Sequence, residues 1–205
     1  MLSLYITRHG ETIWNTEERL QGWKNSPLTE KGVYHATLLE RRLRKTPFEA
    51  IYSSSSDRAV HTAEIVKGER SFEVVKEDLL REISLGHWEG QTHKTLRETY
   101  KEPFDFFWKK PHLYQTETGE TFPMLLTRAK KVLDSLTANH TSGNILLVTH
   151  AVFIKAIIAH VEQRPLHTFW DPPFIHDTSL TIIEWNGAKW NIVTLGDVSH
   201  REHSN

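Results

Sequence analysis

The chain has 205 residues, a formal net charge of −1 at pH 7, 38% hydrophobic and 25% charged residues. This composition is that of an ordinary globular protein with room for a substantial core, and it argues against nucleic-acid binding through a generally basic surface. Cysteine is absent, which excludes disulfides, a thiolate nucleophile and a cysteine-based metal site.

Short strand-like runs alternate with longer helical runs along the chain. In chain order we predict a strand at residues 2–7, a helix at 29–44, a strand at 50–53, a helix at 57–66, strands at 72–75 and 144–149 separated by a helix at 122–138, a helix at 152–161, and strands at 179–185 and 190–195. Thr29 is a plausible helix N-cap, and Asn186-Gly187 is a strong hairpin signal. We therefore expect an α/β three-layer sandwich, in which helices flank a mostly parallel sheet with one antiparallel edge.

The segment from 92 to 114 differs from the rest because it is rich in aromatic residues and is interrupted by Pro103 and Pro111. One interpretation is a small helical cap insertion over one end of the sheet, at about residues 92–120 of a single domain spanning 1–205. The other is a packed helical layer of the core, because irregularly spaced aromatic residues often only bury area. The sequence leaves both open.

The carboxyl ends of the predicted parallel strands carry the residues of greatest chemical interest. Arg8 and His9 follow the first strand, Arg58 lies in the first turn of the helix after the second, and His150 follows the strand at 144–149. Ligands of open α/β sheets bind at this edge, and two helix N-termini would point toward it. Two arginines, two histidines and helix N-termini together predict a phosphate site.

An ordered set of motifs resembles the signature of the histidine phosphatase superfamily, the phosphoglycerate-mutase-like enzymes. The motifs are Leu4-Tyr5-Ile6-Thr7-Arg8-His9-Gly10-Glu11-Thr12 with Asn15, Gln21-Gly22, Ser26-Pro27-Leu28-Thr29-Glu30-Lys31-Gly32, Tyr52-Ser53-Ser54-Ser55-Ser56-Asp57-Arg58-Ala59, Leu80-Arg81-Glu82-Ile83, Gly86-His87-Trp88-Glu89-Gly90 and Val148-Thr149-His150. They cover nearly the whole chain in the right order. The length and the segments 111–114 and 196–200 are most similar to broad-specificity phosphatases of the PhoE type.

The resemblance implies a role for each motif residue. His9 would attack phosphorus and form a phosphohistidine. Glu82 would act as general acid toward the leaving alkoxide and then as general base toward water. The remaining roles are binding ones: Arg8, Arg58 and His150 would clamp the phosphate oxygens, Asn15 would donate a further hydrogen bond, and Gln21 and Gly22 would line the substrate side.

One position departs from the family pattern, which usually has glycine after the second histidine, where this chain has Ala151. The backbone N–H at this position can lie against the phosphate. An ordinary helical φ at Ala151 would cost nothing, whereas a positive φ would cost on the order of 1–2 kcal/mol. We expect activity to survive.

The resemblance implies a metal-independent phosphomonoesterase that acts on small alkyl or aryl phosphate esters. The alternative is a cofactor-dependent phosphoglycerate mutase, which should carry extra basic residues near the substrate; here Lys101, Lys109 and Lys110 are the only such cations expected nearby. A specialised metabolic phosphatase is a third reading, and a catalytically silent phosphate-ligand binding module is a remote one.

No cofactor, metal, nucleic acid or membrane partner is implied. The remaining histidines, His93 among them, lack ligand-like spacing and are most simply surface or helix-face residues. No leader or membrane-spanning segment is recognisable, so a cytoplasmic protein is expected. The oligomeric state cannot be read from the sequence.

Overall fold

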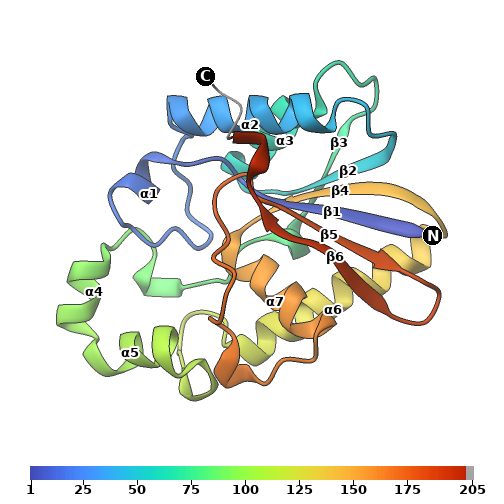
Figure 1. The fold of residues 1–205 in the computed structure, drawn as a ribbon. Helices are drawn as coiled ribbons and strands as arrows, with labels where there is room; N and C mark the ends of the chain where they lie inside the picture. The colour runs from blue at the N-terminus through green and yellow to red at the C-terminus, as the bar shows by residue number, and fades with distance from the viewer. Residues whose placement is uncertain (202–205) are drawn as a thin grey trace.

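The computed structural model describes residues 1–201, in which a six-stranded sheet lies between two layers of helices (Figure 1). The spatial order of the strands is β3-β2-β4-β1-β5-β6. Their bounds are β1 Leu2–Arg8, β2 Phe48–Ser54, β3 Val74–Glu77, β4 Gly143–Thr149, β5 Leu180–Trp185 and β6 Trp190–Asp197. The strands β1 to β4 pair in parallel, whereas β5 runs antiparallel to β1 and β6 antiparallel to β5. The predicted α/β sandwich with an antiparallel edge is confirmed.

Helices cover both faces of this sheet (Figure 1). Their bounds are α1 Ile13–Thr16, α2 Glu30–Leu43, α3 Asp57–Lys67, α4 His93–Thr99, α5 Lys101–Lys109, α6 Phe122–Asn139 and α7 Ala151–Val161. The apolar run of β4 is continuous because the strand is buried on both sides: Ile145 and Leu147 join the core under α6 and α7, while Leu146 and Val148 join the core under α2 and α3. Thr29 caps α2 as predicted, with its hydroxyl accepting from the N–H of Gly32.

Local features differ from the sequence-based prediction: β2 begins two residues earlier, at Phe48, β6 ends two residues later, at Asp197, and β3 and α1 also differ. The strand β3 begins at Val74, two residues later than predicted, and ends at Glu77. Its pairing with β2 sets these bounds, and as an edge strand it carries polar residues that give no apolar signal. The helical turn α1 was not predicted because it is only four residues long, and it depends on a capping box between Thr12 and Asn15.

The aromatic segment forms α4, α5 and a short turn at Pro111–Leu113. Phe104, Phe107 and Tyr114 are almost completely buried and surround Trp88, with ring centroids 5.6–6.0 Å from it. These side chains therefore belong to the main core, as the second interpretation expected. The division into a single domain with a cap insertion at about 92–120 stays a prediction, and residues 202–205 of that domain lie outside the described part of the chain.

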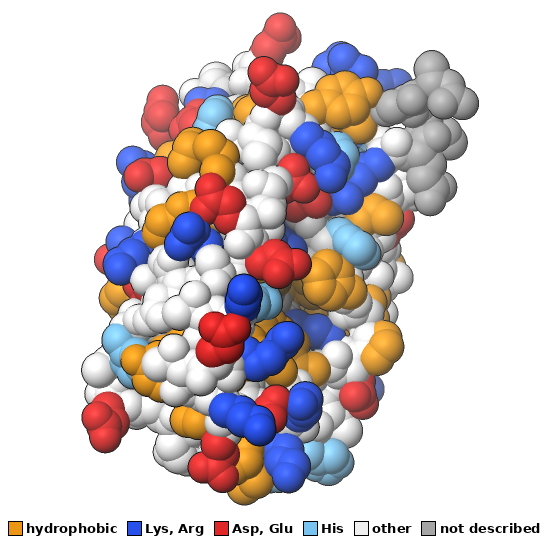
Figure 2. Space-filling view, turned by 90° about the vertical axis from the view of Figure 1, so that its left-hand side faces the viewer, with side chains coloured by type: hydrophobic (Ala, Val, Ile, Leu, Met, Phe, Trp, Pro, Cys, Tyr) orange, Lys and Arg blue, Asp and Glu red, His pale blue; other side chains and the backbone are white. Residues whose placement is uncertain are grey.

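Figure 2 looks onto the side of the molecule that carries α1 and α4 and shows acidic and basic side chains intermixed across it. Within residues 1–201, no helix has the combination of length and apolar character needed to cross a membrane.

Candidate active site

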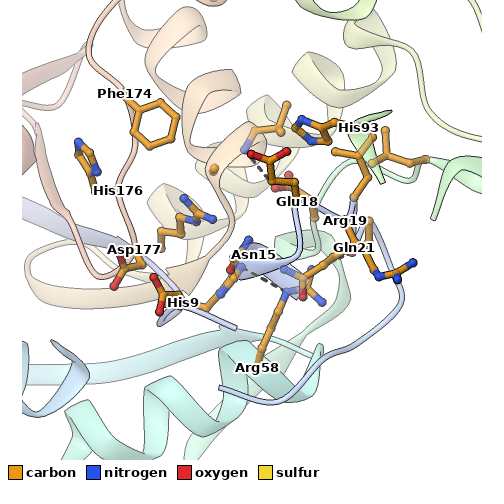
Figure 3. Close-up of a pocket in the computed structure, with 18 of the residues that line it drawn as sticks. His9, Asn15, Glu18, Arg19, Gln21, Arg58, His93, Phe174, His176 and Asp177 are labelled. Carbon is orange, nitrogen blue, oxygen red and sulfur yellow. Dashed lines mark hydrogen bonds between the residues drawn. The ribbon is translucent and has the colours of Figure 1, made fainter. Parts of the chain in front are cut away.

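A cavity of about 400 Å³ lies at the carboxyl ends of β1, β2 and β4 (Figure 3). The predicted site residues that line it are Arg8, His9, Asn15, Gln21, Gly22, Arg58, Glu82 and Ala151. His150 is fully buried and is not part of the lining. The sheet register explains the convergence, because Arg8 pairs with Thr149 and the backbone N–H of His9 donates to the Thr149 carbonyl at 2.9 Å. The next residues on the two strands, His9 and His150, therefore meet with ring centroids 5.1 Å apart.

The ring of His9 is held in one tautomer. Its Nδ1 lies 2.7 Å from the Gly10 carbonyl, which can only accept, so Nδ1 carries the proton and Nε2 keeps its lone pair. The Nε of Arg58 donates to this Nε2 at 3.2 Å. Burial, followed by the charges of Arg58 and Arg8, holds the pKa of His9 well below 6.5. The imidazole is consequently neutral at neutral pH, the form that a nucleophile requires.

Arg58 is the centre of the hydrogen-bond network. It lies at the second position of α3 and is 2% exposed, and it donates to the carbonyls of Gly22 at 2.8 Å and Lys24 at 2.6 Å. Burial lowers its pKa to about 10, which still leaves it charged at neutral pH. The buried charge anchors the loop that follows α1 and faces the cavity beside His9.

His150 contacts Arg58 and His9 and does not line the cavity. Its Nδ1 accepts from Arg58 Nη2 at 3.1 Å, so its Nε2 carries the proton and donates to Ser54 Oγ at 2.8 Å. Burial and Arg58 hold its pKa well below 6.5. With both ring nitrogens engaged, His150 orients Arg58 in this structure, and its contact with a phosphate stays a prediction.

Arg8 and Asn15 each retain a donor without a partner among the described residues. Arg8 Nη1 donates to the Ile175 carbonyl at 2.9 Å, but its buried Nε is unpaired. Asn15 Oδ1 accepts from the N–H and the hydroxyl of Thr12 at 3.0 and 2.9 Å, which leaves the Nδ2 group free. Gln21 completes this network by donating from Nε2 to Thr12 Oγ1 at 2.9 Å. Arg8 and Asn15 thus have spare donors of the kind that an oxyanion accepts from.

Glu82 occupies the N-terminus of α7. Its Oε1 accepts from the N–H of Phe153 at 3.1 Å and its Oε2 from the N–H of Val152 at 3.2 Å. The N–H groups of Val152 and Phe153 at this helix N-terminus therefore bind a carboxylate of the chain itself, and phosphate binding at the N–H of Ala151 stays a prediction. Burial raises the pKa of Glu82 above 4.5, against the opposing effects of its hydrogen bonds to Ile83 and Val152 and of the charge of Arg58.

Gly22 and Ala151 have different backbone requirements. Gly22 has φ +51°, and a Cβ there would lie 2.3 Å from Glu89 Oε1, so this position requires glycine. Ala151 is the first residue of α7 and does not have a positive φ. The alanine in place of the family's usual glycine therefore carries no backbone strain.

The outer wall of the cavity consists of residues that the sequence did not single out: Glu18, Arg19, His93, Phe107, Trp108, Trp170, Phe174, His176 and Asp177. In Figure 3, Glu18 and His93 lie on one side, Phe174 and His176 on the other, and His9 and Arg58 below them. The reading of His93 as a simple surface or helix-face residue is corrected by its place in this wall. The strand β5 could have indicated part of this wall from the sequence. Because β5 is antiparallel to β1, it begins at the edge of the sheet where β1 ends, and the loop before β5 must border the site.

The three lysines expected near the substrate do not reach it. Lys101, Lys109 and Lys110 line a separate surface depression beside α5. Among residues 1–201, no group of three or more histidine, aspartate or glutamate side chains is arranged to hold a metal ion.

Comparison with known proteins places this geometry in a family. The model of the histidine phosphatase superfamily (branch 1) matches residues 4–198. Phosphoserine phosphatase 1 of Hydrogenobacter thermophilus is 31% identical over 170 residues, which cover 83% of this chain and 81% of that protein. The structure of YhfR from Bacillus stearothermophilus is 46% identical, with a TM-score of 0.95 and coverage of 98% and 99% of the two chains. The phosphoglycerate mutase from Bacillus anthracis is 27% identical, with a TM-score of 0.85 and coverage of 97% and 94%.

Proposed function

The chain belongs to the histidine phosphatase superfamily, and from this premise we propose that it is a metal-independent phosphomonoesterase for small alkyl and aryl phosphate esters. The observation that carries the proposal is the neutral imidazole of His9, whose Nε2 lone pair lies beside the buried guanidinium of Arg58 in a cavity with an aromatic outer wall. Hydrolysis of such an ester requires a nucleophile, a site that binds the phosphate anion and an apolar wall that contacts the alcohol group.

In the first chemical step, His9 Nε2 attacks phosphorus as the bond to the ester oxygen breaks. Binding of the phosphate displaces Arg58 Nε from Nε2, and Arg58, Arg8 Nε and Asn15 Nδ2 then donate to the phosphoryl oxygens. The developing charge is stabilised by cations that burial keeps from water. His150 contributes by holding Arg58 in place.

Glu82 supplies the proton transfers. Its raised pKa keeps part of the carboxyl population protonated, and this form protonates the departing alkoxide. The resulting carboxylate takes a proton from the water that attacks the phosphohistidine, which releases inorganic phosphate and restores the starting state. The two roles of one carboxyl group follow from the two steps.

The cations of the cavity favour hydrolysis over the mutase reaction. A mutase must hold the carboxylate of a glycerate phosphate. Arg19 is the one lining cation beyond Arg8 and Arg58 in the described chain, and its guanidinium already pairs with Glu17 and the Gly90 carbonyl. The outer wall instead carries Glu18, whose carboxylate is unpaired among the described residues and repels a second carboxylate.

A substrate panel in the presence of a chelator tests this proposal. It includes aryl and alkyl phosphates, sugar phosphates, and 3-phosphoglycerate with a trace of bisphosphate primer, and both phosphate and 2-phosphoglycerate are followed. We expect phosphate release without isomerisation, and the ranking of the esters shows which alcohol groups the aromatic wall accepts. Isomerisation that outpaces release would identify a mutase, and a single strongly preferred ester would identify a specialised metabolic phosphatase.

The same panel, applied to His9→Ala, distinguishes an enzyme from a catalytically silent binding module. In an enzyme, His9→Ala should abolish turnover, whereas a binding module would show no turnover in either form and would keep its affinity for phosphate ligands in the variant.

A further inference from the structure

Glu18 is an exposed, charged residue of the cavity wall that the proposed chemistry leaves unused. Its side chain lines the cavity, and no hydrogen bond or ion pair to it occurs among residues 1–201. In Figure 3 the carboxylate rises from the segment after α1 and points toward His93, above the level of His9 and Arg58. It therefore faces the part of the cavity where the alcohol group of an ester would lie.

The backbone at Glu18 turns sharply at the end of α1. Glu18 has φ +52°, a left-handed conformation that residues other than glycine rarely adopt. Two backbone hydrogen bonds fix it: its N–H donates to the Asn15 carbonyl at 3.3 Å, and its carbonyl accepts from the N–H of His93 at 2.9 Å. Helices commonly end in a left-handed residue, so this conformation ends α1 and sets where the Glu18 side chain leaves the backbone.

The other charges around the cavity already have partners. Glu11 pairs with Lys31 at 3.0 Å, and Asp177 pairs with His35 at 2.7 Å and with Arg201 at 3.2 Å. Arg19 pairs with Glu17 at 2.5 Å. Burial lowers the pKa of the neighbouring His93, so its ring is neutral at neutral pH and does not neutralise Glu18.

Aromatic rings surround the same space. Trp108 lies 4.7 Å from Trp170 and 5.5 Å from His93 between ring centroids, and all three line the cavity. Phe174 completes the opposite side although 69% of its surface is exposed. Aromatic faces and a carboxylate are the combination that binds ammonium groups, through cation–π attraction and charge pairing.

We propose that Glu18 and this aromatic wall select phosphate monoesters whose alcohol carries a quaternary ammonium group. This inference rests on the proposed phosphatase function and assigns its substrate class. The phosphate of such an ester lies on Arg8 and Arg58, and its ammonium group lies between Glu18 and the rings of Trp108 and Trp170. The arginines then bind the phosphate of the substrate, and Glu18 binds its ammonium group.

The test compares phosphocholine with 3,3-dimethylbutyl phosphate, which has the same shape but carbon in place of the charged nitrogen. We expect kcat/KM of the unmodified protein to be about tenfold higher for phosphocholine. In Glu18→Gln this ratio should fall close to one. Glu98→Gln is the matched control, because Glu98 is exposed on α4, lines no part of the cavity and loses the same charge; its ratio should equal that of the unmodified protein.

The outcomes separate the two proposals. Equal kcat/KM for the two esters in the unmodified protein, or an undiminished ratio in Glu18→Gln, would overturn the role of Glu18 while leaving the phosphatase intact. Lack of hydrolysis of both esters and of p-nitrophenyl phosphate would overturn the proposed function itself. A thermal unfolding midpoint unchanged between the two variants excludes misfolding as the cause of a lost preference.

Discussion

At the scale of single residues, the site depends on hydrogen bonds that leave one atom of each group available. The Gly10 carbonyl fixes the His9 tautomer, and the capping box of Thr12 leaves the amide nitrogen of Asn15 free. Glu82 is half-buried against α7, where desolvation raises its pKa, and it lines the cavity. Contacts with nearby backbone groups thus set the tautomer of His9, the free donor of Asn15 and the orientation of Glu82.

Replacement of Glu82 by a side chain that cannot donate a proton should lower kcat/KM most for esters with poor leaving groups. Glu82→Gln keeps the shape of the side chain but cannot donate a proton to an alkoxide, so we expect kcat/KM for an alkyl phosphate to fall about 10²–10⁴-fold. The loss should be smaller for p-nitrophenyl phosphate, whose phenolate leaves without protonation. Phosphate-release assays on both esters measure the difference. Equal losses on both would show that Glu82 does not act as the acid.

Ala151 should tolerate glycine. Because Ala151 is helical and lines the cavity with no positive φ, Ala151→Gly should lower the free energy of unfolding by less than about 1 kcal/mol and leave kcat/KM within about twofold. Urea denaturation and a p-nitrophenyl phosphate assay check both numbers. A large gain in activity would mean that the alanine obstructs the site.

At the scale of elements, three basic side chains hold the loop that carries part of the outer wall. Lys155 of α7 donates to the Asp171 carbonyl, Arg164 to the Pro172 carbonyl at 3.2 Å, and Arg8 to the Ile175 carbonyl at 2.9 Å. Lys155 is buried, and burial together with the charge of Arg164 lowers its pKa to about 8. The loop is therefore fixed by contacts with distant parts of the chain.

Loss of Lys155 should loosen this loop. In Lys155→Ala the Asp171 carbonyl loses its partner, and we expect faster amide hydrogen exchange over residues 170–177 together with a higher KM for aryl esters. Lys131→Ala, at an exposed position of α6, is the control and should change neither. Unchanged exchange in the Lys155 variant would show that the other two anchors suffice.

These contacts also explain which parts of the site could be predicted from the sequence and which could not. The ends of β1 and β4 and the start of α3 were predictable, because apolar runs and a helix start place Arg8, His9, His150 and Arg58 at one edge. The position of Trp170 and Phe174 was not, because it depends on side chains that reach distant carbonyls and leave no periodic pattern. The occupation of the α7 N-terminus by Glu82 was missed for the same reason.

At the scale of the whole molecule, folding buries two uncharged histidines at the carboxyl edge of the sheet. His9 and His150 have pKa values well below 6.5 in the folded state, first through burial and then through Arg58. In the unfolded chain they titrate near 6.5, so the unfolded state binds more protons below that pH. The stability that these neutral groups contribute is present above about pH 6.5 and is lost as the pH falls toward their folded pKa values.

His150→Gln should reduce this acid sensitivity. One histidine that stays neutral in the fold costs about 1 kcal/mol between pH 6.5 and about 5.5, so the fall in unfolding free energy over this window should be smaller by that amount in the variant. Urea denaturation at the two pH values measures it. His61→Gln, at an exposed position of α3, should leave the fall unchanged. An equal fall in all three proteins would mean that His150 is charged when folded.

The central claim is that His9 carries the phosphoryl group, and rapid quenching during turnover of p-nitrophenyl phosphate, whose leaving group needs no proton from Glu82, tests it most directly. The account predicts an acid-labile, base-stable phosphoryl group on the peptide that contains His9, absent from His9→Ala and accumulating when Glu82→Gln slows its hydrolysis. Turnover in which no phosphorylated protein forms, or a phosphoryl group on another residue, would contradict it.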